Sequence, residues 1–293
     1  MSVFLAARPE GAVCLFGAPF DSTSSYRPGS RFGPQAIREA SYSLETFSSA
    51  QAHDLEDCSF MDTLDLELPF GDPAPALDLI EHRARSVIES GRVPFLLGGE
   101  HLVSLGAVRA AIGAHPDLMV VHIDAHADLR EEYLGMGLSH ATVMRRVMDI
   151  LGTGRIRQIG VRSCTRQEHD AVMELASSPE QIALRIGEKP CYVTVDLDVL
   201  DPSVLPGTGT PEPGGMSYAE LESTLVSIMS RLRVVGLDIV ELAPQLDPSG
   251  VSAVVAAKLV RECLIALDRQ IACRGVPRGP SRPDTSPQAG GEP

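Results

Sequence analysis

The chain has 293 residues, of which 44% are hydrophobic and 22% are charged, close to the average for soluble globular proteins. Its 25 Lys and Arg residues against 39 Asp and Glu residues give a net charge of −14 with histidine neutral. This acidic balance argues against nucleic acid and against an anionic membrane surface as partners, because both attract basic residues. No signal-peptide pattern is visible, and no apolar run approaches the ~18 residues of a membrane helix. We therefore expect a cytoplasmic protein.

Short apolar runs alternate with helical patterns along the chain. The expected strands are residues 13–16, 93–97, 118–123, 156–161, 192–195 and 234–239, which are β-branched or continuously apolar. The expected helices are about residues 76–90, 102–112, 141–151, 218–231 and 252–270. Two long loops, 17–34 and 201–215, are rich in Gly, Pro and Ser. This alternation predicts a three-layer α/β/α sandwich with a mostly parallel sheet, formed by one folded domain of residues 1–273.

The last twenty residues, 274–293, differ in composition from the rest of the chain. They contain five Pro and four Gly but only two aliphatic residues, Val276 and Ala289. Such a segment cannot bury enough apolar surface to offset the entropy lost on ordering. We predict that it is a disordered tail.

Three groups of metal-type ligands follow predicted strands directly. The first is Gly-Gly-Glu-His ending at His101, the second is Asp-Ala-His-Ala-Asp at 124–128, and the third is Asp-Leu-Asp at 196–198. Residues two apart in an extended segment point to the same side, so the ligands of each group can converge. In parallel α/β folds, sites form beyond the carboxyl ends of the strands. The three groups together predict a metal site at that edge of the sheet.

The predicted ligand set contains four carboxylates and two imidazoles. Four carboxylates directed at one volume repel one another unless cations are present, and two divalent ions would balance their charge. A mixed set rich in oxygen suits Mn²⁺ or Mg²⁺, whereas Zn²⁺ prefers a tighter set of nitrogen and sulfur ligands. The imidazoles favour Mn²⁺ over Mg²⁺.

Three further residues are candidates for roles beside these groups. Glu241 follows the strand predicted at 234–239, so its carboxylate can reach the metal face. His140 opens a predicted helix, where a histidine can titrate near neutral pH and exchange protons. His122 is expected to point away from the ligands and to serve in the core or in support of the site.

The motifs at 98–101, 124–128, 194–215 and 238–241 together resemble the ureohydrolase family, which includes arginase and agmatinase. The stretches 17–34 and 128–146 are most similar to the agmatinase form. Three places depart from the common family pattern. Leu102 and Thr194 stand where Ser is frequent, and Leu242-Ala243-Pro244 stands where Val-Ser-Pro is commoner. None of these residues is one of the predicted ligands.

The resemblance implies a binuclear manganese site with two Mn²⁺ per subunit. One ion would be held by His101, Asp124, Asp128 and Asp196, and the other by Asp124, His126, Asp196 and Asp198. Asp124 and Asp196 would bridge the two ions. The resemblance also assigns Glu241 to binding of the guanidinium group, and His140 to substrate contact and proton transfer, with Asp128 relaying a proton.

The implied reaction is hydrolysis of agmatine to putrescine and urea, in polyamine synthesis. Glu131 and Glu132 suit a cationic substrate tail, whereas Arg130 could hold a carboxylate instead. N1-aminopropylagmatine, guanidinobutyrate, arginine and formimidoylglutamate remain alternative substrates. A non-enzymatic relative is disfavoured because every ligand position is intact. The resemblance further implies a homotrimer or homohexamer.

Overall fold

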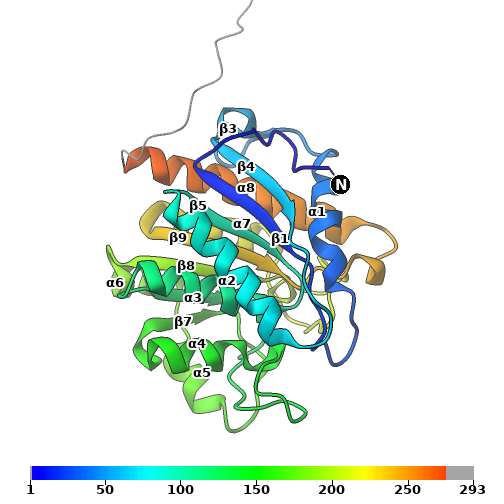
Figure 1. The fold of residues 1–293 in the computed structure, drawn as a ribbon, viewed down its shortest axis with the longest axis vertical. Helices are drawn as coiled ribbons and strands as arrows, with labels where there is room; N and C mark the ends of the chain where they lie inside the picture. The colour runs from blue at the N-terminus through cyan, green and yellow to red at the C-terminus, as the bar shows by residue number, and fades with distance from the viewer. Residues whose placement is uncertain (1, 275–293) are drawn as a thin grey trace, which may run out of the picture.

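Seven parallel strands form the central sheet of the protein in the order β4-β1-β5-β9-β8-β6-β7 (Figure 1). The computed structural model describes residues 2–274. The strands of this sheet are β1 (Val13–Ala18), β4 (Phe60–Asp65), β5 (Val93–Gly98), β6 (Met119–Ile123), β7 (Ile156–Ile159), β8 (Pro190–Asp196) and β9 (Arg233–Val240). A separate antiparallel pair joins β2 (Phe47–Ser48) to β3 (His53–Asp54).

Helices cover both faces of the sheet, and each face has its own hydrophobic core. In Figure 1, α2 (Pro73–Glu89) and α3 (Ser104–Ala114) lie in front of the sheet, and α7 (Tyr218–Arg231) and α8 (Val251–Cys273) lie behind it. The front core also includes α4 (Val143–Leu151) and α5 (His169–Leu175), while α1 (Gly33–Ser41) and α6 (Pro179–Ile186) contribute to the rear core. The predicted three-layer sandwich is confirmed.

All six predicted strands and all five predicted helices are present, with ends that differ by a few residues. The structure adds elements that were not predicted: β4, the β2–β3 pair, α1, α5 and α6. The predicted loop 17–34 is interrupted near its end, where a short 3₁₀ turn at Ser30–Phe32 leads into α1. Pro34 occupies the first turn of α1, where its missing N–H has no cost.

β4 forms an edge of the sheet and carries two acidic residues inward. The guanidinium of Arg38, only 1% exposed, binds Asp62 through Nε at 2.8 Å and Nη2 at 3.0 Å, and it also contacts Asp65. A buried charge is tolerated when it is paired and hydrogen-bonded in this way. This ion-pair group joins α1 to the sheet edge.

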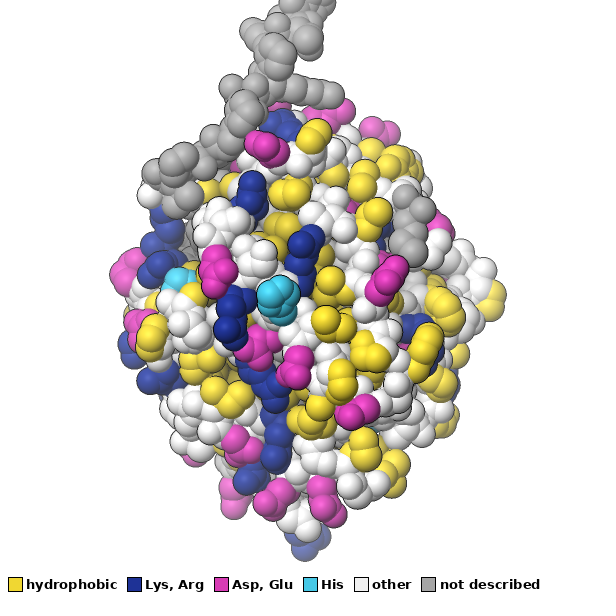
Figure 2. Space-filling view, viewed as in Figure 1, with side chains coloured by type: hydrophobic (Ala, Val, Ile, Leu, Met, Phe, Trp, Pro, Cys, Tyr) yellow, Lys and Arg dark blue, Asp and Glu magenta, His cyan; other side chains and the backbone are white. Residues whose placement is uncertain are grey.

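Among the described residues, no helix is long and apolar enough to cross a membrane. On the face shown in Figure 2, acidic and basic side chains are mixed with hydrophobic ones, so the net negative charge is not concentrated on this face. The predicted tail 274–293 lies outside the described residues except for Arg274.

Candidate metal centre and substrate pocket

The four central strands β5, β9, β8 and β6 end side by side, and each delivers predicted site residues at its carboxyl end. His101 comes three residues after the Gly98 that ends β5, and Glu241 directly follows β9. The 124–128 segment directly follows β6, and Asp196 is the last residue of β8. Because the strands are parallel, side chains distant in the sequence meet at one edge of the sheet.

The loop before His101 is packed too tightly for side chains at its glycines. A Cβ atom on Gly99 would lie 2.0 Å from the carbonyl oxygen of Phe20, and one on Gly98 would lie 2.5 Å from Val240. The Gly-Gly pair therefore allows the loop after β1 to pass directly over the end of β5. That loop then reaches the pocket described below.

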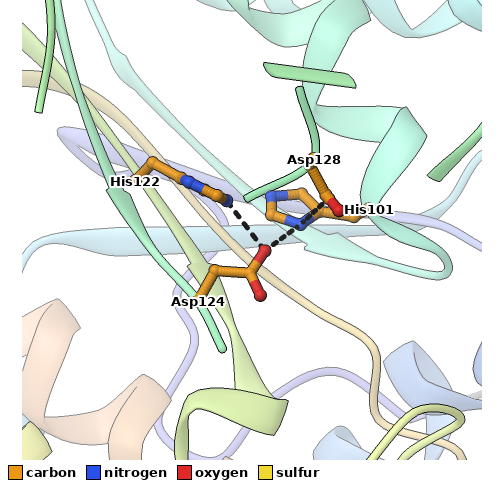
Figure 3. A group of neighbouring side chains, drawn as sticks. All are labelled: His101, His122, Asp124 and Asp128. Carbon is orange, nitrogen blue, oxygen red and sulfur yellow. Dashed lines mark hydrogen bonds and ion pairs between the residues drawn. The ribbon is translucent and has the colours of Figure 1, made fainter. Parts of the chain in front are cut away.

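The imidazole of His101 is the centre of the first ligand group (Figure 3). It is 1% exposed, and its Nδ1 atom faces three carboxylate oxygens, at 3.0 Å from Asp124, 3.2 Å from Asp128 and 3.2 Å from Asp196. Its other nitrogen, Nε2, lies 3.0 Å from the Thr194 hydroxyl.

Thr194 determines which nitrogen of His101 carries the proton. Its hydroxyl donates to Asp238 Oδ1 at 2.5 Å, so the hydroxyl oxygen can only accept from His101 Nε2. The lone pair of Nδ1 is then directed toward the three carboxylates. Metal-binding histidines are typically oriented in this way by a hydrogen bond from their other nitrogen. The departure from Ser at position 194 therefore preserves the hydroxyl that orients the ligand.

His126 is the centre of the second ligand group. Its Nδ1 atom lies 2.9 Å from Asp198 Oδ2 and 3.6 Å from Asp124 Oδ1. Asp196 Oδ1 accepts from the backbone N–H of Asp198 at 2.8 Å. Asp124 thus contributes one carboxylate oxygen to each group, as a bridging ligand must. The structure brings all six predicted ligands together.

The electrostatics of this cluster require positive charge. Burial, followed by repulsion from Asp198 and Asp124, raises the pKa of Asp196 well above its usual range. Burial alone would lower the pKa of His101, yet the surrounding carboxylates raise it well above its usual value. Both shifts reflect an excess of negative charge at one buried point. Oxygen and imidazole donors converging there fit divalent cations.

The predicted orientation of His122 was wrong. Its side chain points toward the ligands, and Nε2 lies 2.8 Å from Asp124 Oδ2 (Figure 3). The reason is the two-residue repeat itself, because His122 and Asp124 are two apart and therefore face the same side. Gln158 Nε2 donates to His122 Nδ1 at 2.9 Å and also to the carbonyl of Ala127 at 2.9 Å. His122 Nε2 thus carries the proton and donates to Asp124, so it supports a ligand rather than binding metal.

Two site residues have backbones in the left-handed region, Asp128 with φ 53° and Glu241 with φ 67°. This region is uncommon for residues other than glycine, and its cost is sustained by neighbouring contacts. The Glu241 N–H donates to the Gly99 carbonyl at 2.9 Å, and its Oε1 accepts from the His101 N–H at 2.8 Å. The unusual backbone turns the Glu241 side chain back toward the metal ligands.

A cavity of about 540 Å³ opens onto the ligand cluster. Its wall includes the predicted residues His101, His126, Asp128, His140 and Glu241. Burial, followed by repulsion from Glu100, raises the pKa of Glu241 well above its usual range. A cationic group bound in the cavity would oppose that shift by favouring the charged carboxylate.

His140 lies on the opposite wall of the cavity, held by the loop after β1. Its backbone N–H donates to Thr23 Oγ1 at 3.1 Å, and its ring Nε2 lies 3.4 Å from Ser25 Oγ. The Tyr133 ring meets it edge-on, with 5.6 Å between ring centroids. Thr23 is itself anchored, because its hydroxyl donates to Glu100 at 2.6 Å. His140 is therefore a half-buried imidazole that contacts the hydroxyls of Thr23 and Ser25 and lines the cavity.

Apart from Asp128 and Glu241, the acidic residues that line the cavity differ from those the sequence indicated. Glu131 and Glu132 are exposed and lie beside a neighbouring depression, whereas Glu168 and Glu212 line the cavity together with Arg130. Glu168 is 7% exposed and accepts backbone N–H groups from Leu129 at 3.1 Å and Thr165 at 2.7 Å. Sequence reasoning missed it, although it follows β7 at the same carboxyl edge.

Comparison with known proteins agrees with this geometry. The model of the Arginase family matches residues 11–266. The chain is 42% identical over 276 residues to the agmatinase of Bacillus subtilis strain 168, covering 90% of this chain and 95% of the relative. A crystal structure from Clostridium difficile superposes with a TM-score of 0.86 at 42% identity, covering 89% of this chain and 99% of the other. The agmatine ureohydrolase of Thermoplasma volcanium gives a TM-score of 0.83 at 34% identity, covering 94% and 96%. The chain belongs to the arginase family.

Proposed function

We propose that this protein hydrolyses agmatine to putrescine and urea, a reaction of polyamine synthesis. The observation that carries the proposal is the convergence of six buried or half-buried ligands at the base of a cavity whose wall holds Glu241. A guanidinium group is a planar cation, and this cavity offers carboxylates at its base and on its wall. The 42% identity to an agmatinase over nearly the whole chain supports the same substrate.

The donor set leads us to propose two Mn²⁺ ions per subunit. His101, Asp124, Asp128 and Asp196 would hold one ion, and Asp124, His126, Asp196 and Asp198 would hold the other. When bound, a pair of divalent ions lowers the pKa of water and so supplies a nucleophile at neutral pH.

The chain's own residues would orient the substrate and move protons. Glu241 would bind the planar guanidinium through charge-assisted hydrogen bonds and thereby set the angle of attack at its carbon. Asp128, at the edge of the ligand cluster, would accept the proton released by the attacking water and deliver it to the departing nitrogen, which leaves as an amine. His140 faces the same cavity and would exchange protons between the site and solvent.

The charged residues of the cavity wall indicate which guanidino compound would be preferred as substrate. Glu168 and Glu212 favour a substrate with a cationic tail, as in agmatine or the longer N1-aminopropylagmatine. Arg130 is the observation that favours a second candidate, because its guanidinium also lines the cavity. It lies 4.5 Å from the centroid of the Tyr133 ring and could bind the carboxylate of arginine or guanidinobutyrate.

We further propose that the protein works in the cytoplasm as a homotrimer or homohexamer. The compartment is supported by its six cysteines, none of which forms a disulfide among the described residues. The assembly is supported by large apolar side chains that remain exposed on the isolated chain, including Phe70 at 83% and Tyr26 at 71%. Sedimentation velocity on the full chain tests the assembly.

Urea release from a panel of guanidino compounds tests the proposed reaction. The full chain is stripped with a chelator, reloaded with Mn²⁺, and assayed with agmatine, N1-aminopropylagmatine, guanidinobutyrate and arginine. We expect urea and equimolar putrescine from agmatine, and no urea before metal is restored. Urea from arginine or guanidinobutyrate alone would overturn the choice of agmatine, and no urea from any compound would overturn the hydrolase assignment.

A further inference from the structure

A second group of metal-type side chains lies at the opposite end of the sheet from the substrate pocket. His53 belongs to β3, Cys58 follows the 3₁₀ turn at Leu55–Asp57, and Asp268 lies near the end of α8. Cys58 comes two residues before Phe60, which begins β4 and pairs with Val13 at the start of β1. The group therefore lies at the amino ends of the strands.

The donor atoms of this group converge although three separate segments supply them. The imidazole nitrogen of His53, the sulfur of Cys58 and a carboxylate oxygen of Asp268 all lie within 4.8 Å of one another. Cys58 is 0% exposed and Asp268 is 1% exposed. His53 is half-buried as a residue, but its Nε2 atom is buried and has no hydrogen-bond partner.

An unpartnered, buried imidazole nitrogen beside a buried carboxylate is unfavourable in a folded protein. One carboxylate oxygen of Asp268 accepts the Ser59 N–H at 3.1 Å, which fixes that side chain against the segment carrying Cys58. The thiol of Cys58 is oriented toward the Asp54 carbonyl at 3.6 Å. A cation placed between the three donor atoms would be a shared partner for the His53 imidazole, the Cys58 sulfur and a carboxylate oxygen of Asp268.

We propose that His53, Cys58 and Asp268 bind a Zn²⁺ ion, separate from the catalytic centre. Nitrogen, sulfur and oxygen donors in one small set suit Zn²⁺, which accepts all three and completes a tetrahedron with water. Mn²⁺, in contrast, prefers oxygen-rich sets such as the one at the carboxyl end of the sheet. Binding converts the Cys58 thiol to thiolate, and its proton passes to solvent.

The site would reinforce a junction that side-chain hydrogen bonds already form, from Ser48 and Gln51 to Glu262 and from Arg261 to the Glu45 carbonyl. The β2–β3 pair and the following turn would be tied to α8, the long helix of the rear layer. The proposal is independent of the hydrolase reaction, because none of the six catalytic ligands is a cysteine.

Absorption spectroscopy with Co²⁺ distinguishes the two centres. The metal-stripped full chain is titrated with Co²⁺ under reducing conditions, because a thiolate ligand gives an intense near-ultraviolet charge-transfer band that nitrogen and oxygen ligands do not. We expect this band in the wild-type protein, its loss in Cys58→Ser, and its weakening in His53→Gln. Zn²⁺ added afterwards should remove it, and bound zinc should fall by about one ion per chain in Cys58→Ser.

The exposed Cys273 on α8 and Cys164 on the cavity wall provide matched controls. Cys273→Ser and Cys164→Ser should each retain the band. The proposal is overturned if wild type shows no band, if the band survives Cys58→Ser, or if Cys164→Ser removes it. If Cys58→Ser does not fold, His53→Gln provides the test instead. His53 is half-buried, so its replacement leaves the apolar core intact.

Discussion

His122 offers a direct test of how the metal ligands are supported. His122→Phe keeps an aromatic ring of similar size in the strand but removes both ring nitrogens. Asp124 Oδ2 then loses the hydrogen bond that it accepts at 2.8 Å, and Gln158 Nε2 loses its acceptor at 2.9 Å. Every group involved is buried, so water cannot replace either bond.

The expected magnitude follows from the type of bond. A buried hydrogen bond to a charged acceptor contributes about 1.5–3 kcal/mol. At about 1.4 kcal/mol per tenfold change, its loss should weaken metal binding by roughly 10- to 100-fold. This agrees with the usual effect of removing a group that orients a metal ligand. The turnover number at saturating Mn²⁺ should change much less, because His122 does not line the cavity.

The assay measures bound Mn²⁺ against buffered free Mn²⁺ for wild type and His122→Phe. Urea release is followed in the same samples. His82→Phe is the matched control, because His82 is exposed on α2, away from the cluster. Gln158→Leu should give a smaller loss, and combining it with His122→Phe should add little. If His122→Phe binds Mn²⁺ as tightly as wild type, the proposed support of Asp124 is refuted.

Three further results are expected. Asp124→Asn should remove bound metal and urea release together, and retained activity would contradict its bridging position between His101 and His126. Glu241→Gln should retain bound metal but lower kcat/KM by about 10- to 100-fold through loss of a charged hydrogen bond, so an unchanged kcat/KM would exclude guanidinium binding there. Hydrogen bonds from Ser249 and Ser252 lower the pKa of Asp247 from 3.8 to about 2. Because this pKa is depressed on folding, its stabilisation is present above about pH 4 and is lost as pH falls toward 2. Urea unfolding of wild type and Asp247→Asn should give free energies that differ at neutral pH and converge in acid, and a difference independent of pH would contradict this.

The convergence of the six proposed ligands could be predicted from the sequence because two simple regularities locate it. Parallel strands end at one edge of the sheet, and residues two apart in an extended segment share a side. The same rule, applied to His122 and Asp124, predicts that these two side chains meet. The contact between His122 and Asp124 thus follows from the two-residue spacing. Only the structure shows that Gln158, on the neighbouring strand β7, hydrogen-bonds to His122.

Other features depend on contacts between distant residues. β4 is not evident in the sequence because Asp62 and Asp65 resemble a polar loop, and only the structure shows that buried Arg38 pairs with both. The chain between Glu132 and His140 turns back sharply, with left-handed backbones at Leu134 (φ 51°) and Gly135 (φ 77°). That turn leaves Glu131 and Glu132 outside the cavity, which a one-dimensional pattern does not reveal.

The distribution of the ligands over strand ends has a consequence for stability. The two proposed ions would contact residues that follow β5, β6 and β8, and β9 lies between β5 and β8. The ions cannot remain bound once these central strands separate, so their release would accompany global unfolding rather than local fraying. Each ion would then stabilise the whole domain by about 2.7 kcal/mol when its free concentration is 100 times its Kd. Melting temperatures of this protein would therefore be comparable between variants only at a fixed concentration of free metal.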